Sequence, residues 1–405
     1  MRRHAVLVGL AIVLLSANLR PAVASVGPVL PELRAGLRLS GTQTAVLTML
    51  PVLFFGLLAP VAPRLARRIG IEPVLAGALA ALAVGLVGRV LAGPSLLFAG
   101  TILVGGAIAV ANVLLPPLVK RDFPHRTGLM MGIYTTAIAA AAAIAAGVTV
   151  PVTDAFGWDW RGALGMWVAP AAIALLVWLP LIRSHTRPPA QPHAGPPLAR
   201  DPLAWQVTAF FGLQSLQFYV MLGWLPSIYR DHGYRPAAAG FLLSLFGLVQ
   251  LPVTLLLPRL ATRARNQVIH VVLSTAILGV GLVGMLVAPT AAPYLWVVLA
   301  GIGCGACFAL ALALVVLRTG RVAETARLSA MAQTVGYVIS AFGPLVFGIL
   351  HETVGSWTAP VLLLVLLVVP QLWCGVLAGR SRVLADRLTR SDAVRRAGAG
   401  VASGG

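Results

Sequence analysis

The chain has 405 residues, of which 59% are hydrophobic and only 10% are charged, whereas a soluble domain carries about 25% charged residues. This composition excludes an ordinary soluble domain and indicates a membrane protein. A formal net charge of +19 would suit a nucleic-acid-binding protein, but such proteins gather their basic residues on one face. Here the basic residues fall singly between apolar runs, so we expect no nucleic-acid partner.

Twelve segments are long and apolar enough to cross a membrane, which takes about 20 residues. The first is interpreted as a retained span rather than a cleaved signal peptide, because its apolar character continues to about residue 33 and similar segments follow. The predicted spans are 5–31, 42–62, 73–92, 96–118, 128–151, 162–182, 203–228, 237–257, 268–288, 292–317, 326–349 and 358–379. The predicted fold class is therefore an all-α membrane protein with twelve transmembrane helices.

In membrane proteins, the loops on the cytoplasmic side carry an excess of arginine and lysine residues. With both termini placed in the cytoplasm, 23 of the 30 basic residues fall in cytoplasmic segments and six in outside loops, Arg89 being counted with the outside loops. Both termini are therefore predicted to be cytoplasmic, in a bacterial inner membrane. The thirtieth basic residue is Arg20, which belongs to neither set.

The chain repeats itself at a separation of about 195 to 198 residues, as PRLARR from Pro63 and PRLATR from Pro258 show. Six predicted spans separate the copies, so two six-helix bundles with the same orientation are expected, related by an axis along the membrane normal. The predicted domains are an N-terminal bundle at 1–183, a Pro-rich cytoplasmic linker at 184–201, a C-terminal bundle at 202–380 and a disordered cytoplasmic tail at 381–405.

Arg20 lies ~22 Å along the first span if that span is one continuous helix. An arginine at the centre of a membrane helix costs from about 2.5 to more than 10 kcal/mol and normally faces a bundle interior. The small residues that share its stripe favour an inward direction, and no acidic residue falls near mid-membrane. Two interpretations stay open: Arg20 contacts a negatively charged substrate, or it is bound by polar protein groups alone.

Other polar residues within the predicted spans are candidates for the same substrate site. Their alternative interpretation is hydrogen bonding between helices or packing, worth ~0.6 to 2 kcal/mol for a hydrogen bond. Gln214, Gln217 and Trp224 share one face of the seventh span at helical spacing. The full set of predicted substrate-binding residues is Arg20, Asn112, Tyr134, Gln214, Gln217, Trp224, Gln333 and Tyr337.

No metal site and no cofactor are expected. The three cysteines, Cys304, Cys307 and Cys374, all lie in apolar runs and have no zinc-site spacing. The sequence also lacks the HExxH, GxSxG and GxxxxGK[ST] motifs of common enzyme classes, so the chain is not expected to be an enzyme; a membrane sensor or enzyme is the remote alternative.

Four motifs together resemble one branch of a known transporter family. They are NLRPAVASVGPVLPELR, NVLLPPLVKRDFPHRTGLMMG, WLPSIY and GIGCGACFALALAL, which occur in this order along the membrane portion. As a set they resemble the cyanate transporter and 2-nitroimidazole transporter branch of the major facilitator superfamily. The resemblance implies a monomeric carrier in the lipid bilayer that moves a small planar anionic or polarised solute by alternating access. Its coupling ion is unknown, and multidrug or metabolite efflux is the alternative function.

The resemblance also directs attention to the loops after the second and eighth spans, where the superfamily usually has an acidic residue and a basic cluster. Pro63 and Pro258 stand at the acidic positions, which puts the usual charge contact in doubt. The remaining basic residues are predicted to form cytoplasmic gating loops, or alternatively to be simple positive-inside anchors. They are Arg64, Arg67, Arg68, Arg259 and Arg263.

Overall fold

A computed structural model of the chain is helical throughout and describes residues 2–91, 93–184 and 198–384. The earlier helices are α1 (Arg2–Ala17), α2 (Pro21–Ala24), α3 (Leu30–Leu37), α4 (Gly41–Leu58), α5 (Val61–Ile69), α6 (Ile71–Leu91), α7 (Gly93–Asp122), α8 (Thr127–Phe156), α9 (Trp160–Gly165) and α10 (Val168–Trp178). The later helices are α11 (Pro202–Asp231), α12 (Pro236–Leu248), α13 (Gln250–Arg263), α14 (Val268–Val287), α15 (Pro293–Leu317), α16 (Val322–Val354) and α17 (Thr358–Gly379). Short 3-10 turns are η1 (Gly27–Val29), η2 (Pro124–Arg126), η3 (Leu179–Ser184) and η4 (Leu198–Arg200).

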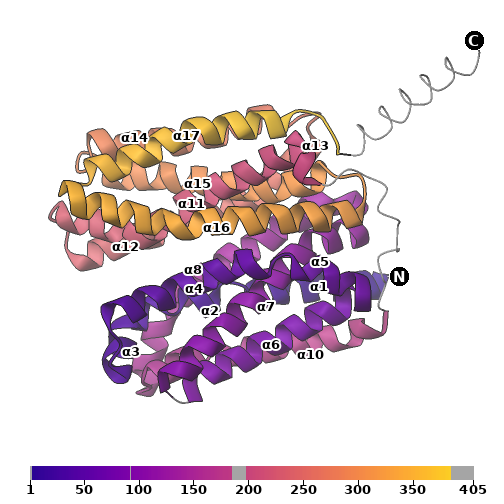
Figure 1. Ribbon diagram of the computed structural model, residues 1–405, viewed down its shortest axis with the longest axis horizontal. Helices are drawn as coiled ribbons and strands as arrows, with labels where there is room; N and C mark the ends of the chain where they lie inside the picture. The colour runs from indigo at the N-terminus through magenta and orange to yellow at the C-terminus, as the bar shows by residue number, and fades with distance from the viewer. Residues whose placement is uncertain (1, 92, 185–197, 385–405) are drawn as a thin grey trace, which may run out of the picture.

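The helices form two groups that lie side by side (Figure 1). Helices α1 to α10 make the first group and helices α11 to α17 the second. The start of α1 and the end of α17 lie at the same end of the molecule, which is called the terminal end below. The domain boundaries stay a prediction, because most of the predicted linker (185–197) and the tail from residue 385 lie outside the described residues.

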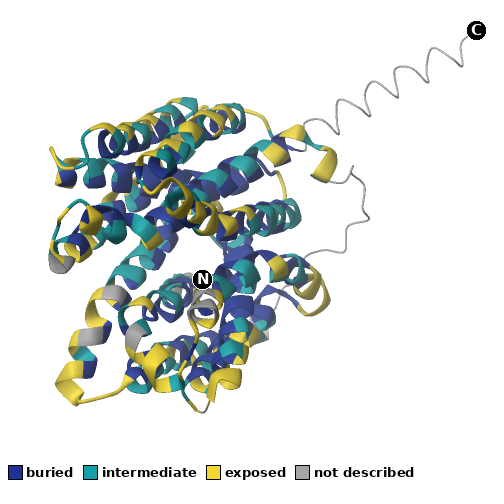
Figure 2. Ribbon diagram, turned by 60° about the vertical axis from the view of Figure 1, so that its left-hand side comes forward, coloured by how far each residue is buried: buried dark blue, intermediate teal, exposed yellow. Residues whose placement is uncertain are grey.

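The outer surface of both groups is apolar, as a lipid-facing surface must be. Large aliphatic and aromatic side chains are exposed along the helices, for example Leu176, Val369 and Trp373 at 65%, 67% and 68% exposure. Buried residues concentrate between the helices and between the two groups (Figure 2). Within the described residues ten helices are long and apolar enough to span a membrane, and eleven if the bent pair of α4 and α5 counts as one span.

Two differences from the predicted spans have clear causes. The predicted span 42–62 is bent by 53° between α4 and α5, where Pro60 supplies no backbone N–H for the helix. Helix α11 is 30 residues long but is not among the spans that pass on hydropathy, since Gln206, Gln214 and Gln217 interrupt its apolar run. The count of twelve spans therefore stays a prediction.

Matching contacts recur in the two groups at the repeat distance seen in the sequence. Gly105 of α7 lies against Pro51 and Phe54 of α4, and Gly301 of α15 lies against Phe246 and Val249 around α12. Each contact partner is shifted by the same 195 or 196 positions, so each group repeats the other's helix packing.

The matching extends to two arginines at the terminal end, Arg121, which is half-buried, and Arg318, which is buried. Arg121 at the end of α7 pairs with Glu72 at 2.7 Å, and Arg318 just after α15 donates to Gln267. These four positions are related by the same repeat, although the acid of the first pair is an amide in the second. The first group thus has an ion pair at the place where the second group has a hydrogen bond from an arginine to a neutral amide oxygen.

We predict that Gly301→Leu destabilises the second group of helices. A Cβ at Gly301 would lie 2.7 Å from the carbonyl oxygen of Phe246, so α15 and α12 must move apart, and overpacking of this kind costs about 1 to 3 kcal/mol. The midpoint of thermal unfolding in detergent, followed by tryptophan fluorescence, should fall by about 3 °C or more. Gly77→Leu is the matched control, because no atom lies within 4 Å of its added Cβ. Equal midpoints for the two variants would contradict the close approach.

Candidate functional site

The sequence predicts one continuous helix for the first span, but in the structure this span breaks at Arg20. Helix α1 ends at Ala17 and α2 begins at Pro21, with a turn between them. Pro21 has no N–H to donate to the helix and disfavours helical geometry at the residue before it. The amides of Asn18 and Leu19 therefore bond to carbonyls only three residues back, Leu15 and Ser16. The break places Arg20 at a corner of the backbone within the membrane span.

The guanidinium of Arg20 reaches across to the second group of helices. Its Nη1 donates a 2.5 Å hydrogen bond to the hydroxyl of Tyr219 on α11. Its central carbon lies 5.7 Å from the ring centroid of Phe55 on α4 and 5.8 Å from that of Tyr219, within the range of cation–π attraction. Among the residues that the structure describes, Arg20 forms no ion pair. As a residue, Arg20 is half-buried.

Further aromatic rings pack against the two that the guanidinium contacts. The ring of Tyr337 on α16 lies 5.3 Å from Phe55 and 5.3 Å from Phe211, edge to face in both cases, and 6.4 Å from Tyr219. Phe55, Phe211, Tyr219 and Tyr337 are called the aromatic cage below, and all four are buried. Their rings come from α4, α11 and α16, so the cage includes both groups of helices. Such rings offer flat faces to a planar solute and lower the local dielectric around the charge.

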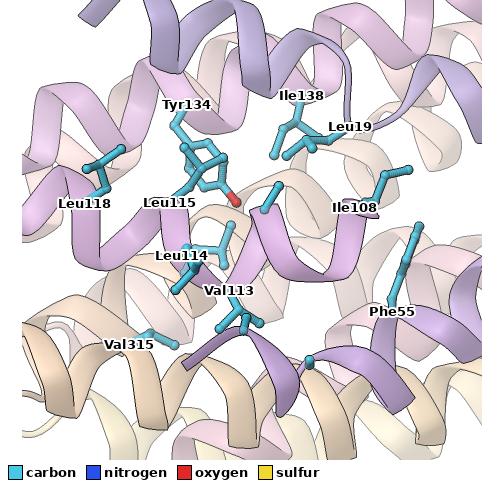
Figure 3. Close-up of a cluster of buried hydrophobic side chains, with 14 of the residues drawn as sticks. Leu19, Phe55, Ile108, Val113, Leu114, Leu115, Leu118, Tyr134, Ile138 and Val315 are labelled. Carbon is cyan, nitrogen blue, oxygen red and sulfur yellow. The ribbon is translucent and has the colours of Figure 1, made fainter. Parts of the chain in front are cut away.

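A polar cluster lies beside the cage, formed by three residues that the sequence predicts as site residues. The Tyr134 hydroxyl donates to Asn112 Oδ1 at 3.4 Å, and Gln333 Nε2 donates across the two groups to the Asn112 carbonyl at 3.1 Å. Tyr134 interacts electrostatically with Arg20, and its hydroxyl is turned toward α7 (Figure 3). Asn112 Nδ2 and Gln333 Oε1 are buried and have no hydrogen-bond partner in the structure. One unpaired donor and one unpaired acceptor are thus available here.

The three predicted residues on α11 lie elsewhere. Gln214 is buried and donates to its own helix, to the Phe211 carbonyl and to Ser215 Oγ. Gln217 is buried, and neither end of its amide has a partner. Trp224 Nε1 donates to the Pro344 carbonyl of α16 at 3.0 Å, within the second group. Only Arg20, Asn112, Tyr134, Gln333 and Tyr337 of the predicted set are brought together, and the substrate role of every member stays a prediction.

Sequence reasoning missed Tyr219, Phe55 and Phe211. Tyr219 lies on a different face of α11 from Gln214 and Gln217, at about 100° of rotation per residue, and that face was not singled out. The two phenylalanines lie in apolar runs where nothing distinguishes them from lipid-facing residues. Only the packing of α4 and α11 against α16 shows that Phe55 lies beside Arg20 and that Phe211 packs against Tyr337.

The two groups contact each other closely at the terminal end and in the middle. Helix α8 packs along α13 and only lightly on α12, while α4 packs on α16. Thr135 Oγ1 donates to the Thr254 carbonyl at 2.8 Å, and Thr136 and Thr254 share a 3.2 Å hydroxyl contact. The hydrogen bonds between the groups that involve Arg20, Lys120, Thr135 and Gln333 lie in the middle or toward the terminal end. The structure is therefore closed at the terminal end.

One cation crosses this closed interface, and it is not among the predicted gating residues. Lys120, the single lysine of the sequence, donates from the end of α7 to the carbonyl oxygens of Val316 and Thr319 and to Thr319 Oγ1. These acceptors lie at the C-terminal end of α15, where carbonyls lack helical partners and carry partial negative charge. The five predicted gating arginines are exposed, and their role stays a prediction.

A cavity of about 300 Å³ lies at the other end of the second group, away from Arg20. Its lining includes Asp231, His351 and Trp357. Asp231 Oδ2 accepts a 3.0 Å hydrogen bond from Trp357 Nε1 and lies 3.9 Å from His351 Nε2. None of the predicted substrate-binding residues lines this cavity.

An apolar outer surface, and a charged site enclosed between two packed groups of helices, define a multi-spanning membrane transporter rather than an enzyme. The sequence profile described as Major Facilitator Superfamily matches residues 6–344. The chain is 39% identical over 383 residues to the 2-nitroimidazole transporter of Escherichia coli (strain K12), covering 92% of this chain and 95% of that protein. It is 31% identical over 350 residues to the cyanate transport protein CynX of the same organism, with 86% and 91% covered.

A third relative is the uncharacterized transporter YycB of Bacillus subtilis (strain 168), 38% identical over 375 residues, with 92% of this chain and 93% of that protein covered. Among solved structures, the proton:xylose symporter XylE superposes with a TM-score of 0.78 at 13% identity, covering 95% of this chain and 98% of that one. That likeness concerns the fold alone. The chain belongs to the major facilitator superfamily, and the resemblance to its cyanate and 2-nitroimidazole transporter branch is confirmed.

We predict that Lys120→Met loosens the closed terminal end. The substitution removes the cation that bonds the end of α15, and hydrogen bonds to charged groups are worth about 1.5 to 3 kcal/mol. Spin labels at Ile69 and Leu260, both exposed near the ends of α5 and α13, report the distance between the groups. The longer-distance population should grow in Lys120→Met. Arg126→Met, which removes an exposed charge at the same end, should leave the distribution unchanged, and an identical distribution in both variants would contradict the role of Lys120.

Proposed function

We propose that this transporter carries a small planar solute that is anionic or bears partly negative oxygen atoms, and that Arg20 binds those atoms. The observation that supports the proposal is the environment of Arg20: a guanidinium inside the membrane span that lies over the rings of Phe55 and Tyr219, with no ion pair among the described residues. A buried cation is strongly stabilised by an opposite charge. A solute that brings this charge supplies what the protein does not.

The surrounding groups suit a flat molecule. The cage offers ring faces at the distances at which aromatic groups stack or meet edge to face. Asn112 Nδ2 and Gln333 Oε1 offer one donor and one acceptor to a polar heterocycle or a small anion. A cyanate ion and a nitro group both present electron-rich ends to a guanidinium. The names of the two relatives, a cyanate transport protein and a 2-nitroimidazole transporter, agree with this chemistry, and we adopt them as a guide to the class of solute.

Transport would proceed by alternating access. The two groups of helices would rock about the site, so that the closed terminal end opens while the other end closes. Lys120 and the threonine contacts between α8 and α13 would break in that step. The loops at the terminal end hold most of the basic residues, which supports a cytoplasmic position for this end. A monomer with twelve spans in a bacterial inner membrane completes the proposal.

We predict that Arg20→Ala strongly lowers uptake while the protein still folds, because the alanine removes the guanidinium but leaves the cage. A charged hydrogen-bond donor is worth about 1.5 to 3 kcal/mol, so uptake should fall by roughly 10- to 150-fold. Arg20→Lys should restore transport poorly, because an ammonium lacks the planar fork of a guanidinium. The measurement is uptake of cyanate, nitrate and 2-nitroimidazole into proteoliposomes that contain equal amounts of monodisperse protein.

Arg230→Ala is the control, since this arginine is exposed at the end of α11 and should transport like the wild type. Unchanged uptake by Arg20→Ala would remove Arg20 from the site. Uptake of a cationic dye by the wild type, without uptake of the three probes, would favour multidrug transport instead.

A further inference from the structure

A second arginine is buried close to the break in the first span. Arg89 lies near the end of α6 and is 2% exposed, although the sequence pattern places it with the outside loops. Its Nη1 donates a 2.6 Å hydrogen bond to the carbonyl of Ala22, two residues beyond Arg20. Within the described residues Arg89 has no ion pair, and its Nε has no hydrogen-bond partner. The Ala22 carbonyl is therefore the group that holds this guanidinium.

The carbonyl of Ala22 needs a donor because the chain turns directly after α2. In a continuous helix the amide of Val26 would bond to Ala22, but here it bonds to the Val23 carbonyl at 3.3 Å. The turn continues into η1, which begins at Gly27 and contains Pro28. A buried carbonyl without a donor costs about 1 to 3 kcal/mol unless another group supplies one. Arg89 supplies it from the neighbouring helix.

The stem of Arg89 reaches Ala22 by passing over a glycine. Its Cγ lies 2.9 Å from the point where a Cβ would stand on Gly100 of α7. Any larger residue at position 100 would collide with the stem or with α6. The placement of Arg89 thus depends on the close packing of α6 on α7.

A separate contact fixes the other side of the break. Asn18 Nδ2 donates to the Leu14 carbonyl of α1 at 2.8 Å and to the Pro170 carbonyl of α10 at 3.2 Å. Arg20 therefore lies between two anchored points, Asn18 on the α10 side and Ala22 on the α6 side. The direction in which its guanidinium points depends on both anchors.

We propose that Arg89 is a positioning residue for Arg20: by binding the Ala22 carbonyl it fixes the broken segment so that the Arg20 guanidinium stays in the aromatic cage. This inference rests on the proposed function insofar as Arg20 binds the solute. Without the anchor, α2 has only four residues of helix and few bonds of its own, so Arg20 would sample other directions. Solute binding would weaken, while the rocking of the two groups would continue.

The experiment compares Arg89→Met and Arg89→Lys with Arg318→Met. Arg318 is the matched control, because it is also a buried arginine that donates to carbonyls at a helix end, those of Ala378 and Gly379, but far from the break. Two quantities are measured: hydrogen–deuterium exchange of the peptide covering residues 16–30 in detergent, and KM and maximal rate of 2-nitroimidazole uptake in proteoliposomes.

In Arg89→Met the 16–30 peptide should exchange about tenfold faster or more, and KM should rise by about tenfold or more, as expected for loss of a charged hydrogen bond. The maximal rate per folded protein should change much less. Arg89→Lys keeps a cationic donor and should recover most of both effects. Arg318→Met should leave the exchange of 16–30 and KM unchanged even if less protein folds.

Unchanged exchange of the 16–30 peptide in Arg89→Met would overturn the proposal, and so would faster exchange with an unchanged KM, since Arg89 would then be structural only. If Arg89→Met does not fold, Arg89→Gln, which lacks the charge and has a shorter reach, takes its place with the same two criteria. Failure of the wild type to take up any probe would instead defeat the proposed function. The exchange measurement would still decide whether Arg89 holds the break.

Discussion

The structure is organised around a positive charge that lies inside the membrane span and pairs with no carboxylate of the described residues. The guanidinium of Arg20 is satisfied in part by the Tyr219 hydroxyl and by two aromatic faces, which lower the cost of the charge but do not neutralise it. Because these partners come from both groups of helices, the charge also joins the two groups at mid-span. This shared, unpaired charge is the feature on which the proposed transport of a negative solute depends.

The break in the first span makes this arrangement possible. In a continuous helix, the position of Arg20 along the helix would alone set the direction of its side chain, and the backbone carbonyls would be bonded within the helix. Pro21 interrupts the helix, and contacts on both sides hold the broken segment: the Asn18 side chain donates to the Pro170 carbonyl of α10, and the Ala22 carbonyl, left without a helical donor by the turn after α2, accepts from Arg89. Irregular backbone of this kind is tolerated inside a membrane only where protein groups satisfy it. The same contacts that satisfy the irregular backbone would also fix the direction of the Arg20 side chain.

The repeat in the chain explains why the two groups meet as they do. Helices α8 and α4 of the first group pack on α13 and α16 of the second, and each pair is the counterpart of the other at the repeat distance. The two groups differ, however, in some of the charged contacts at the terminal end. Glu72 has an amide, Gln267, as its counterpart, and Lys120 of the first group donates to the second group, whereas the buried Arg318 of the second group donates within its own group. Two bundles with similar packing thus form a contact at the terminal end in which the donor comes from the first group and the acceptors from the second.

The sequence by itself determined the membrane class, the position of most spans, the repeat, the family and the isolation of Arg20, because apolar length, charge distribution and the absence of mid-span acids are properties of composition and spacing. Asn112, Tyr134, Gln333 and Tyr337 were also visible, as polar groups in apolar runs. Tertiary structure alone decided which face of α11 meets Arg20, so that Tyr219 and not Gln214 or Trp224 lies there, and it alone showed that Phe55 and Phe211 complete the cage. It also showed that Arg89, which the sequence pattern placed with the outside loops, is buried in the protein interior. Helical rotation, the breaks at prolines and the close approach of α6 to α7 at Gly100 depend on contacts between distant segments, and no local pattern of residues records them.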